Sequence, residues 1–154
     1  MVKNMQTFLP LPDFVDTAKV LDWRRLGKQR VEAMQIIKAI EIGKGWVNHP
    51  ATKMWTPYVD ALKLYHNIII QEWIERGYKN NMTLYCISSE PEMPWWLGID
   101  DFHKTHQSML VQKLPEHYEK FFPNVDKNLE YLWPSRDSFI KKYAKARLNG
   151  IEKS

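Results

Sequence analysis

The sequence has little of what marks a secreted, membrane-bound or disulfide-rich protein. Among its 154 residues there is one cysteine, Cys86, which excludes an internal disulfide and favours a reducing compartment. No uninterrupted apolar run approaches the roughly 20 residues that cross a bilayer, and the N-terminus lacks the apolar stretch of a secretory signal. These absences predict a soluble cytoplasmic protein with no membrane partner.

Common catalytic signatures are also missing. The sequence contains no Gly-rich phosphate loop, no paired cysteine zinc ligands and no nucleophile elbow. The pattern nearest to a metal motif is His103-x-x-His106, which places two imidazoles on one face of a helix. A third ligand would have to come from His49, His117 or a distant carboxylate, and two histidines at this spacing more often make hydrogen bonds. We therefore expect no metal and no other cofactor.

The composition is that of one ordinary globular domain, with 44% apolar and 26% charged residues. The net charge is +4, from 22 basic against 18 acidic residues. From Arg136 onward there are six basic and two acidic residues, which leaves 16 of each sign before it. The whole excess of positive charge therefore lies near the C-terminus. We expect a helical domain over residues 1–134 and a basic helix or tail over 135–154, an arrangement that suits an anionic partner.

The spacing of apolar residues predicts a mostly α fold, with three main helices and long irregular connections in a single compact domain. We expect these helices at residues 21–42, 57–76 and 102–113. Residues 83–87 form a candidate short strand. Gly27 lies inside the first helix, where glycine costs up to about 1 kcal/mol relative to alanine, so it marks a bend or a close approach to the backbone.

The first of these helices has two distinct faces. Its apolar face carries Leu26, Ala33, Ile37 and Ile40, and its opposite face carries Arg24, Lys28 and Gln35, with Arg25 and Glu32 beside them. Asp22 precedes Leu26 by four residues and therefore extends the apolar stripe. The pattern predicts a carboxylate that points inward and cations that point outward.

Outward cations on a helix are typical of nucleic-acid binding, because lysine and arginine hold the phosphate backbone. We therefore expect a nucleic acid as the partner. The residues expected to contact it are Arg24, Lys28, Arg30, Asn48, His103, His106 and Lys113. Trp23, Trp46 and Trp55 are candidates for stacking on bases, although a tryptophan more often belongs to the core.

The order of these stretches resembles the pyrimidine dimer DNA glycosylase family. The resemblance is carried by the run from Leu21 to Arg30, by Asn48-His49-Pro50, by Trp73-Ile74-Glu75-Arg76-Gly77-Tyr78 and by the histidine-bearing third helix. It covers residues 5–134 and is of the phage endonuclease V type. It is most specific for the bacterial branch of the family, through Met-Gln-Thr-Phe-Leu-Pro at residue 5 and Arg-Leu-Gly-Lys-Gln-Arg-Val-Glu at residue 25.

The resemblance implies a compact, mostly α enzyme that acts on DNA without a cofactor. In such enzymes the terminal α-amine attacks the sugar C1′, the base is expelled, and a Schiff base forms that can lead to strand cleavage by β-elimination. An α-amine titrates near neutrality, so a useful fraction is nucleophilic. Removal of Met1 would expose Val2, whereas a start at Met5 would keep Met5, and neither is the terminal threonine of the family.

The chain departs from the family at the acid. The family's Tyr-Arg-Glu-Leu, which holds its catalytic glutamate, aligns with Trp23-Arg24-Arg25-Leu26. Arg24 keeps the phosphate-binding arginine and Lys28 keeps the charge of a second one, but Arg25 replaces the glutamate. Asp22 is the nearest replacement, and Glu32, expected to face outward, is another. The candidate catalytic residues are Asp22, Arg25 and His49.

Three functions follow from these observations. The first is a DNA N-glycosylase and abasic-site lyase that acts on damaged or modified pyrimidines through an amine nucleophile. The second is a non-catalytic nucleic-acid-binding module on the same scaffold, which Arg25 favours. The third is an enzyme that processes a nucleotide or modified base with Asn48, His49, His103 and His106. In each case we expect a monomer without an obligate protein partner, associated with the nucleoid in the cytoplasm.

Overall fold

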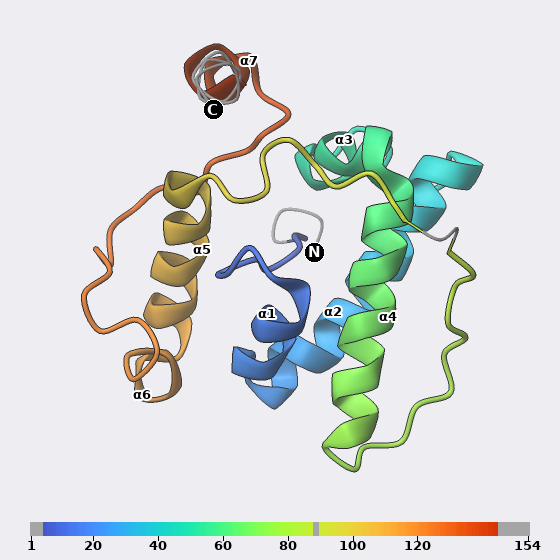
Figure 1. Cartoon of the computed structure of the whole chain (residues 1–154), viewed down its shortest axis with the longest axis horizontal. Helices are drawn as coiled ribbons and strands as arrows, with labels where there is room; N and C mark the ends of the chain where they lie inside the picture. Colours follow the sequence, from blue (N-terminus) through green and yellow to red (C-terminus); the bar gives the residue numbers. More distant parts are fainter. Residues whose placement is uncertain (1–4, 88–89, 145–154) are drawn as a thin grey trace.

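The structure is a computed structural model that describes residues 5–87 and 90–144, and these ranges contain helices and loops but no strand (Figure 1). The elements are α1 (Phe14–Val20), α2 (Trp23–Ile42), α3 (Pro50–Trp55), the 3₁₀ turn η2 (Thr56–Tyr58), α4 (Val59–Glu75), α5 (Asp100–Lys113), α6 (Pro115–Tyr118), α7 (Asp137–Phe139) and the π-turn η3 (Ile140–Ala144). The longest are α2, α4 and α5. The predicted mostly α fold in one compact domain is confirmed.

The ends of the helices follow local chemistry. Helix α1 begins after Asp13, whose side chain accepts a hydrogen bond from the Asp16 N–H. Helix α2 ends at Gly43, which has φ 70° and donates its N–H to Ala39 O, a left-handed cap that glycine adopts without strain. Helix α4 begins at Val59, later than predicted, because residues 56–58 form the 3₁₀ turn η2.

Helices α2 and α4 pack on each other and form the centre of the fold. Gly27 lies directly against a side chain of α4: a Cβ added there would lie 2.9 Å from Cζ3 of Trp73. The glycine therefore marks a close approach, one of the two alternatives that the sequence left open. Trp73 in turn donates its indole N–H to Lys79 O at 2.8 Å, which holds the ring in place.

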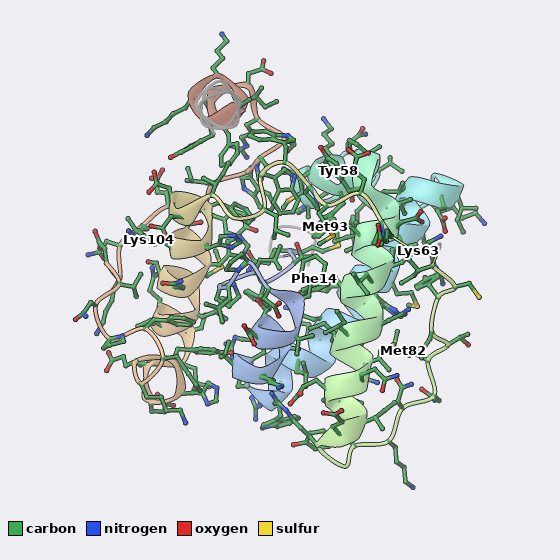
Figure 2. The ribbon with its side chains drawn as sticks, in the orientation of Figure 1. Phe14, Tyr58, Lys63, Met82, Met93 and Lys104 are labelled. Carbon is green, nitrogen blue, oxygen red and sulfur yellow. The ribbon has the colours of Figure 1, made fainter. Side chains whose placement is uncertain are left out.

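The segment 79–87 is extended but forms no strand, which corrects the prediction of one at residues 83–87. Its partner is a side chain of α4 and not another strand. The Asn67 amide donates Nδ2–H to Tyr85 O at 2.9 Å, and its Oδ1 accepts from Tyr85 N at 3.0 Å. Met82 in Figure 2 marks this segment beside α4.

The N-terminal segment, residues 5–12, passes through the middle of the molecule between α5 and the α2–α4 pair (Figure 1). Residues 5–10 are buried, although the segment belongs to no helix. Buried backbone groups require hydrogen-bond partners, and here side chains of α2, α4 and α5 supply them. Phe14 follows at the centre of the core (Figure 2), with its ring centroid 5.4 Å from that of Tyr65.

The C-terminal part covers one end of this core. Phe139 of α7 is buried, and its ring centroid lies 5.7 Å from that of Trp95 and 6.3 Å from that of Phe102. Residues 145–154 of the predicted basic tail lie outside the described residues. Within the described ranges, none of the helices is both long and apolar enough to cross a membrane.

Candidate functional site

Four cations surround a small opening on the surface of the molecule. Arg24, Arg25 and Lys28 of α2 and Lys113 of α5 line a cavity of about 150 Å³, together with Gln6 and Phe8 of the N-terminal segment. Arg24 is exposed, and the Lys28 side chain is 57% exposed. Trp23 at the start of α2 is 53% exposed, and the Arg24 guanidinium lies 5.3 Å from its ring centroid. The predicted outward-facing cations are therefore at the surface and are joined there by Lys113.

Asp22 points inward as predicted, but its carboxylate is already bound. Arg25 Nη1 lies 3.2 Å from Oδ2, and the Tyr118 hydroxyl donates a short hydrogen bond to Oδ1. The Asp22 N–H in turn donates to the Tyr118 oxygen at 2.9 Å. Burial acts to raise the pKa of Asp22, but the Tyr118 hydrogen bond and the Arg25 charge outweigh it and leave the pKa below its usual value. Asp22 thus joins α2 to α6 and holds Arg25 at the opening.

A second carboxylate lies deeper, at Glu32, which is only 5% exposed. Its Oε2 accepts from the Gln6 backbone N–H at 3.2 Å, and its Oε1 lies 3.4 Å from Gln29 Nε2 and 4.0 Å from Lys28 Nζ. Burial raises the pKa of Glu32 above its usual value, although the Lys28 charge and the Gln6 N–H partly offset this effect. The expectation that Glu32 faces outward was wrong, because the N-terminal segment covers that side of α2.

A larger cavity, of about 520 Å³, adjoins the same residues. Its walls come from the N-terminal segment, from α5 and from the chain after α6: Met5, Gln6, Met109, Gln112, Lys113, Tyr131 and Trp133. Gln6 and Lys113 line both cavities. The buried carboxylate therefore lies beside Gln6, where an aromatic cavity and a cationic opening meet.

The histidines of α5 are in the core and not at this opening. His103 lies with Nδ1 2.7 Å from Leu9 O and accepts from the Gly98 N–H at Nε2, at 2.8 Å. His106 accepts the Leu9 N–H at Nδ1, at 2.9 Å, and is fully buried. Burial lowers the pKa of both imidazoles, so they stay neutral. They hold the N-terminal segment in the core, which corrects the expectation that they contact DNA.

The remaining predicted site residues lie elsewhere. His49 accepts the Ala51 N–H at the start of α3 and stacks edge-on against Trp133. In space, His49 contacts Trp133, Trp133 contacts Tyr131, and Tyr131 contacts His106. Two aromatic rings thus lie between the two imidazoles, so the histidines do not form one cluster. Asn48 is exposed next to His49. Within residues 5–87 and 90–144, no group of three or more His, Cys, Asp or Glu side chains could hold a metal ion.

Arg30 points to a different side of α2 from the other predicted cations. Its guanidinium carbon lies 4.1 Å from the Trp73 ring centroid, and Nη1 donates to Asn80 Oδ1 at 3.1 Å. Burial lowers the pKa of Arg30. The structure thus gives Arg30 a role in holding α2 against α4 and the segment that follows.

Sequence reasoning missed the buried polar side chains that hold the N-terminal segment beside the acid. Gln29 and Tyr65 are both fully buried and bind the N-terminal segment. One signal was present: Gln29 lies three residues after Leu26 and four before Ala33, within the apolar stripe. A glutamine in such a place predicts a buried hydrogen-bond network, but not its partner.

The site thus combines a cationic opening, which suits a polyanion, with a buried carboxylate that contacts two of its lining residues, Gln6 and Lys28. The sequence model of the family described as pyrimidine dimer DNA glycosylase matches residues 5–85, more than half of the chain, and the chain belongs to this family. The match includes Arg24, Lys28 and Glu32 but not α5. Neither the search of curated proteins nor the search of solved structures gave a match.

Proposed function

We propose that the protein is a DNA N-glycosylase and abasic-site lyase that acts on damaged or modified pyrimidines through an amine nucleophile. Family membership supports a DNA repair glycosylase. The observation that carries the finer proposal is Glu32, a buried carboxylate with a raised pKa that binds the N-terminal segment beside a cationic opening. Buried carboxylates with perturbed pKa values are typical of catalytic sites.

The cationic opening is suited to the phosphate backbone. Arg24 and Lys28 project from one face of α2, and Lys113 reaches the same cavity from α5. Three cations on two elements match the spread of charge along a strand, and such contacts position DNA without reading its sequence. Arg25 is only 21% exposed and is paired with Asp22, so it adds a fixed charge near the reacting sugar.

The proposed chemistry uses Glu32 in place of the family's catalytic glutamate, which aligns with Arg25 in this chain. The amine attacks C1′, the bond from C1′ to the base breaks, and its electron pair leaves with the base, which takes up a proton. Glu32 accepts a proton from the attacking amine and stabilises the positive charge that develops on the sugar. Ring opening gives a protonated Schiff base, and loss of a C2′ proton then expels the 3′ phosphate.

Two amines are candidates for the nucleophile. A chain that begins at Met5 would carry its α-amine one residue from the Gln6 nitrogen, which lies 3.2 Å from Glu32. The other is Lys28 Nζ, 4.0 Å from Glu32 Oε1. Of the two, the α-amine is favoured, because its ordinary pKa lies near neutrality whereas that of lysine lies well above it.

The test is borohydride trapping on duplexes that carry ultraviolet lesions, modified pyrimidines or abasic sites. Glu32→Gln should reduce the trapping rate by about 100-fold or more and leave the affinity for DNA within about two-fold. Glu72→Gln is the matched control, since Glu72 pairs with Arg76 at the far end of α4. Mass mapping of the trapped peptide identifies the amine. If the wild-type protein gives no adduct on any of these duplexes, the proposal is wrong.

A non-catalytic DNA-binding module is the second candidate, and Arg25 is the observation that favours it. An arginine in place of the family's glutamate adds phosphate affinity without adding an acid or base. This function predicts salt-dependent binding together with a complete absence of adducts. A trapped adduct that depends on Glu32 would exclude it.

A further inference from the structure

We propose that Gln29 is a positioning residue, whose side-chain amide fixes the N-terminal segment and Glu32 relative to each other. This inference rests on the proposed function, because it concerns the same site. It assigns a role to the buried polar residue at the middle of the contact between α2 and residues 6–8. Gln29 itself has no accessible surface, so it acts through the groups that it holds.

The amide of Gln29 has one possible orientation. Its Oε1 accepts the Phe8 N–H at 2.9 Å, and its Nε2 donates to Gln6 O at 2.9 Å. Because one backbone partner is a donor and the other an acceptor, exchanging the two ends of the amide would break both bonds. The side chain therefore pairs with residues 6–8 as a neighbouring strand would, and it sets their register along α2.

Tyr65 of α4 supports this arrangement from the other side. Its hydroxyl lies 2.6 Å from Gln29 Oε1 and 2.8 Å from Phe8 O, and its single proton is shared between these two acceptors. Burial raises the pKa of Tyr65 well above its usual value, so the hydroxyl keeps its proton. Helices α2 and α4 thus bind the same short piece of backbone.

The amide also reaches the acid. Nε2 lies 3.4 Å from Glu32 Oε1, while the Gln6 N–H donates to Oε2 at 3.2 Å. Gln29, Gln6 and Glu32 therefore form a closed ring of contacts. A shift of about 1 Å in a reacting group can cost about 100-fold in rate, so loosening this ring should reduce the rate of the chemical step more than binding.

Asn67 provides a matched control. Its amide binds both backbone groups of Tyr85 in the way that Gln29 binds Gln6 and Phe8, at 2.9 and 3.0 Å. It holds segment 79–87, which runs along the outer side of α4, whereas the N-terminal segment lies on the inner side (Figure 1). The side-chain hydrogen bonds of Asn67 go to Tyr85 and His66, so its loss removes an amide clamp without touching the site.

The experiment compares Gln29→Met with Asn67→Leu, two apolar variants of similar shape. In the wild type, the NMR signal of the Gln6 N–H should follow the ionisation of Glu32, and Glu32→Gln should abolish this titration. Gln29→Met should raise the titration midpoint, because the Gln29 hydrogen bond favours the ionised form, whereas Asn67→Leu should leave it unchanged. The single-turnover rate should fall by about ten-fold or more in Gln29→Met, with DNA affinity within about two-fold.

Equal effects of the two variants on the titration and the rate would overturn the inference, because Gln29 and Asn67 would then both have only a structural role. If Gln29→Met does not fold, Tyr65→Phe removes a single hydroxyl and should move the midpoint in the same direction by less. An unchanged midpoint in Tyr65→Phe would then overturn the inference. The titration needs no substrate. A wild type without activity would therefore refute the proposed function but not the inference about Gln29.

Discussion

The contact between Gly27 and Trp73 allows a sharp test of how α2 and α4 are packed. Gly27→Ala would place a methyl group 2.9 Å from Cζ3 and 3.0 Å from Cη2 of the indole. The ring cannot move away easily, since its N–H bonds Lys79 O, the Tyr78 ring centroid lies 4.4 Å from its own, and Arg30 covers it at 4.1 Å. The two helices would therefore have to separate.

The size of the effect is a difference between two opposing contributions. Overpacking of a tight contact costs about 1–3 kcal/mol, whereas replacing glycine by alanine inside a helix contributes about 1 kcal/mol of stability. We expect a net loss of about 1 kcal/mol in the free energy of unfolding. This corresponds to a fall of about 2–4 °C in Tm for a chain of this length.

Urea denaturation of four proteins measures this coupling: the wild type, Gly27→Ala, Trp73→Leu and the double variant. In the Trp73→Leu background the indole is absent, so Gly27→Ala should stabilise the protein by up to about 1 kcal/mol. The change in the free energy of unfolding caused by Gly27→Ala should therefore have opposite signs in the two backgrounds. If Gly27→Ala has the same effect in both, the indole is not what excludes a side chain at this position, and the reasoning fails.

Three further predictions concern charge. Arg24→Ala should reduce the slope of log affinity for DNA against log salt by about 0.9, whereas Lys63→Ala, a cation on α4, should leave the slope unchanged. Glu32→Gln should raise Tm at neutral pH: the folded pKa of Glu32 is raised, so its ionised form costs stability above that pKa, and the gain should vanish as the pH falls below it. Tyr118→Phe should cost about 1–3 kcal/mol at neutral pH, as measured by urea denaturation. Because the folded pKa of Asp22 is lowered, the contribution of its carboxylate is lost as the pH falls through that pKa, so the difference between wild type and Tyr118→Phe should narrow in acid to the cost of the unpaired Asp22 N–H.

The helices could be predicted from the sequence because their signals are local. Apolar spacing, Gly43 after the first helix and Pro115 after the third lie within a few residues of the ends that they determine. The inward direction of Asp22 also followed from its distance of four residues from Leu26. These features depend on helical geometry alone, and the structure has α2 ending at Ile42 and α5 at Lys113.

The burial of Glu32 could not be predicted in this way. Glu32 lies four residues before Ile36 and three after Gln29, at the edge of the apolar stripe. A helix covered by one neighbour would leave this edge in water. Helix α2 is covered by α4 on one side and by the N-terminal segment on the other, so its buried face is wider than a single stripe, and only the tertiary structure shows this.

The partners that hold the extended segments escaped prediction for a related reason. Residues 6–9 and 79–87 are held by amide and imidazole side chains of distant helices, and such pairing leaves no periodic pattern in the segment that is held. The Asn67 amide, for example, takes the place that a neighbouring strand would have beside Tyr85. Residues 83–87 are therefore a candidate strand in the sequence, but they form no strand in the structure.

The position of the N-terminal segment has a consequence for how the protein is made. Leu9 is bound by His103 and His106, and Pro10 O accepts from Gln107, all of them about a hundred residues further along the chain. Residues 9 and 10 must therefore wait until α5 has been synthesised before their backbone groups are satisfied. Residues 5–12 can therefore take up their final place between α5 and the α2–α4 pair only after α5 has been made.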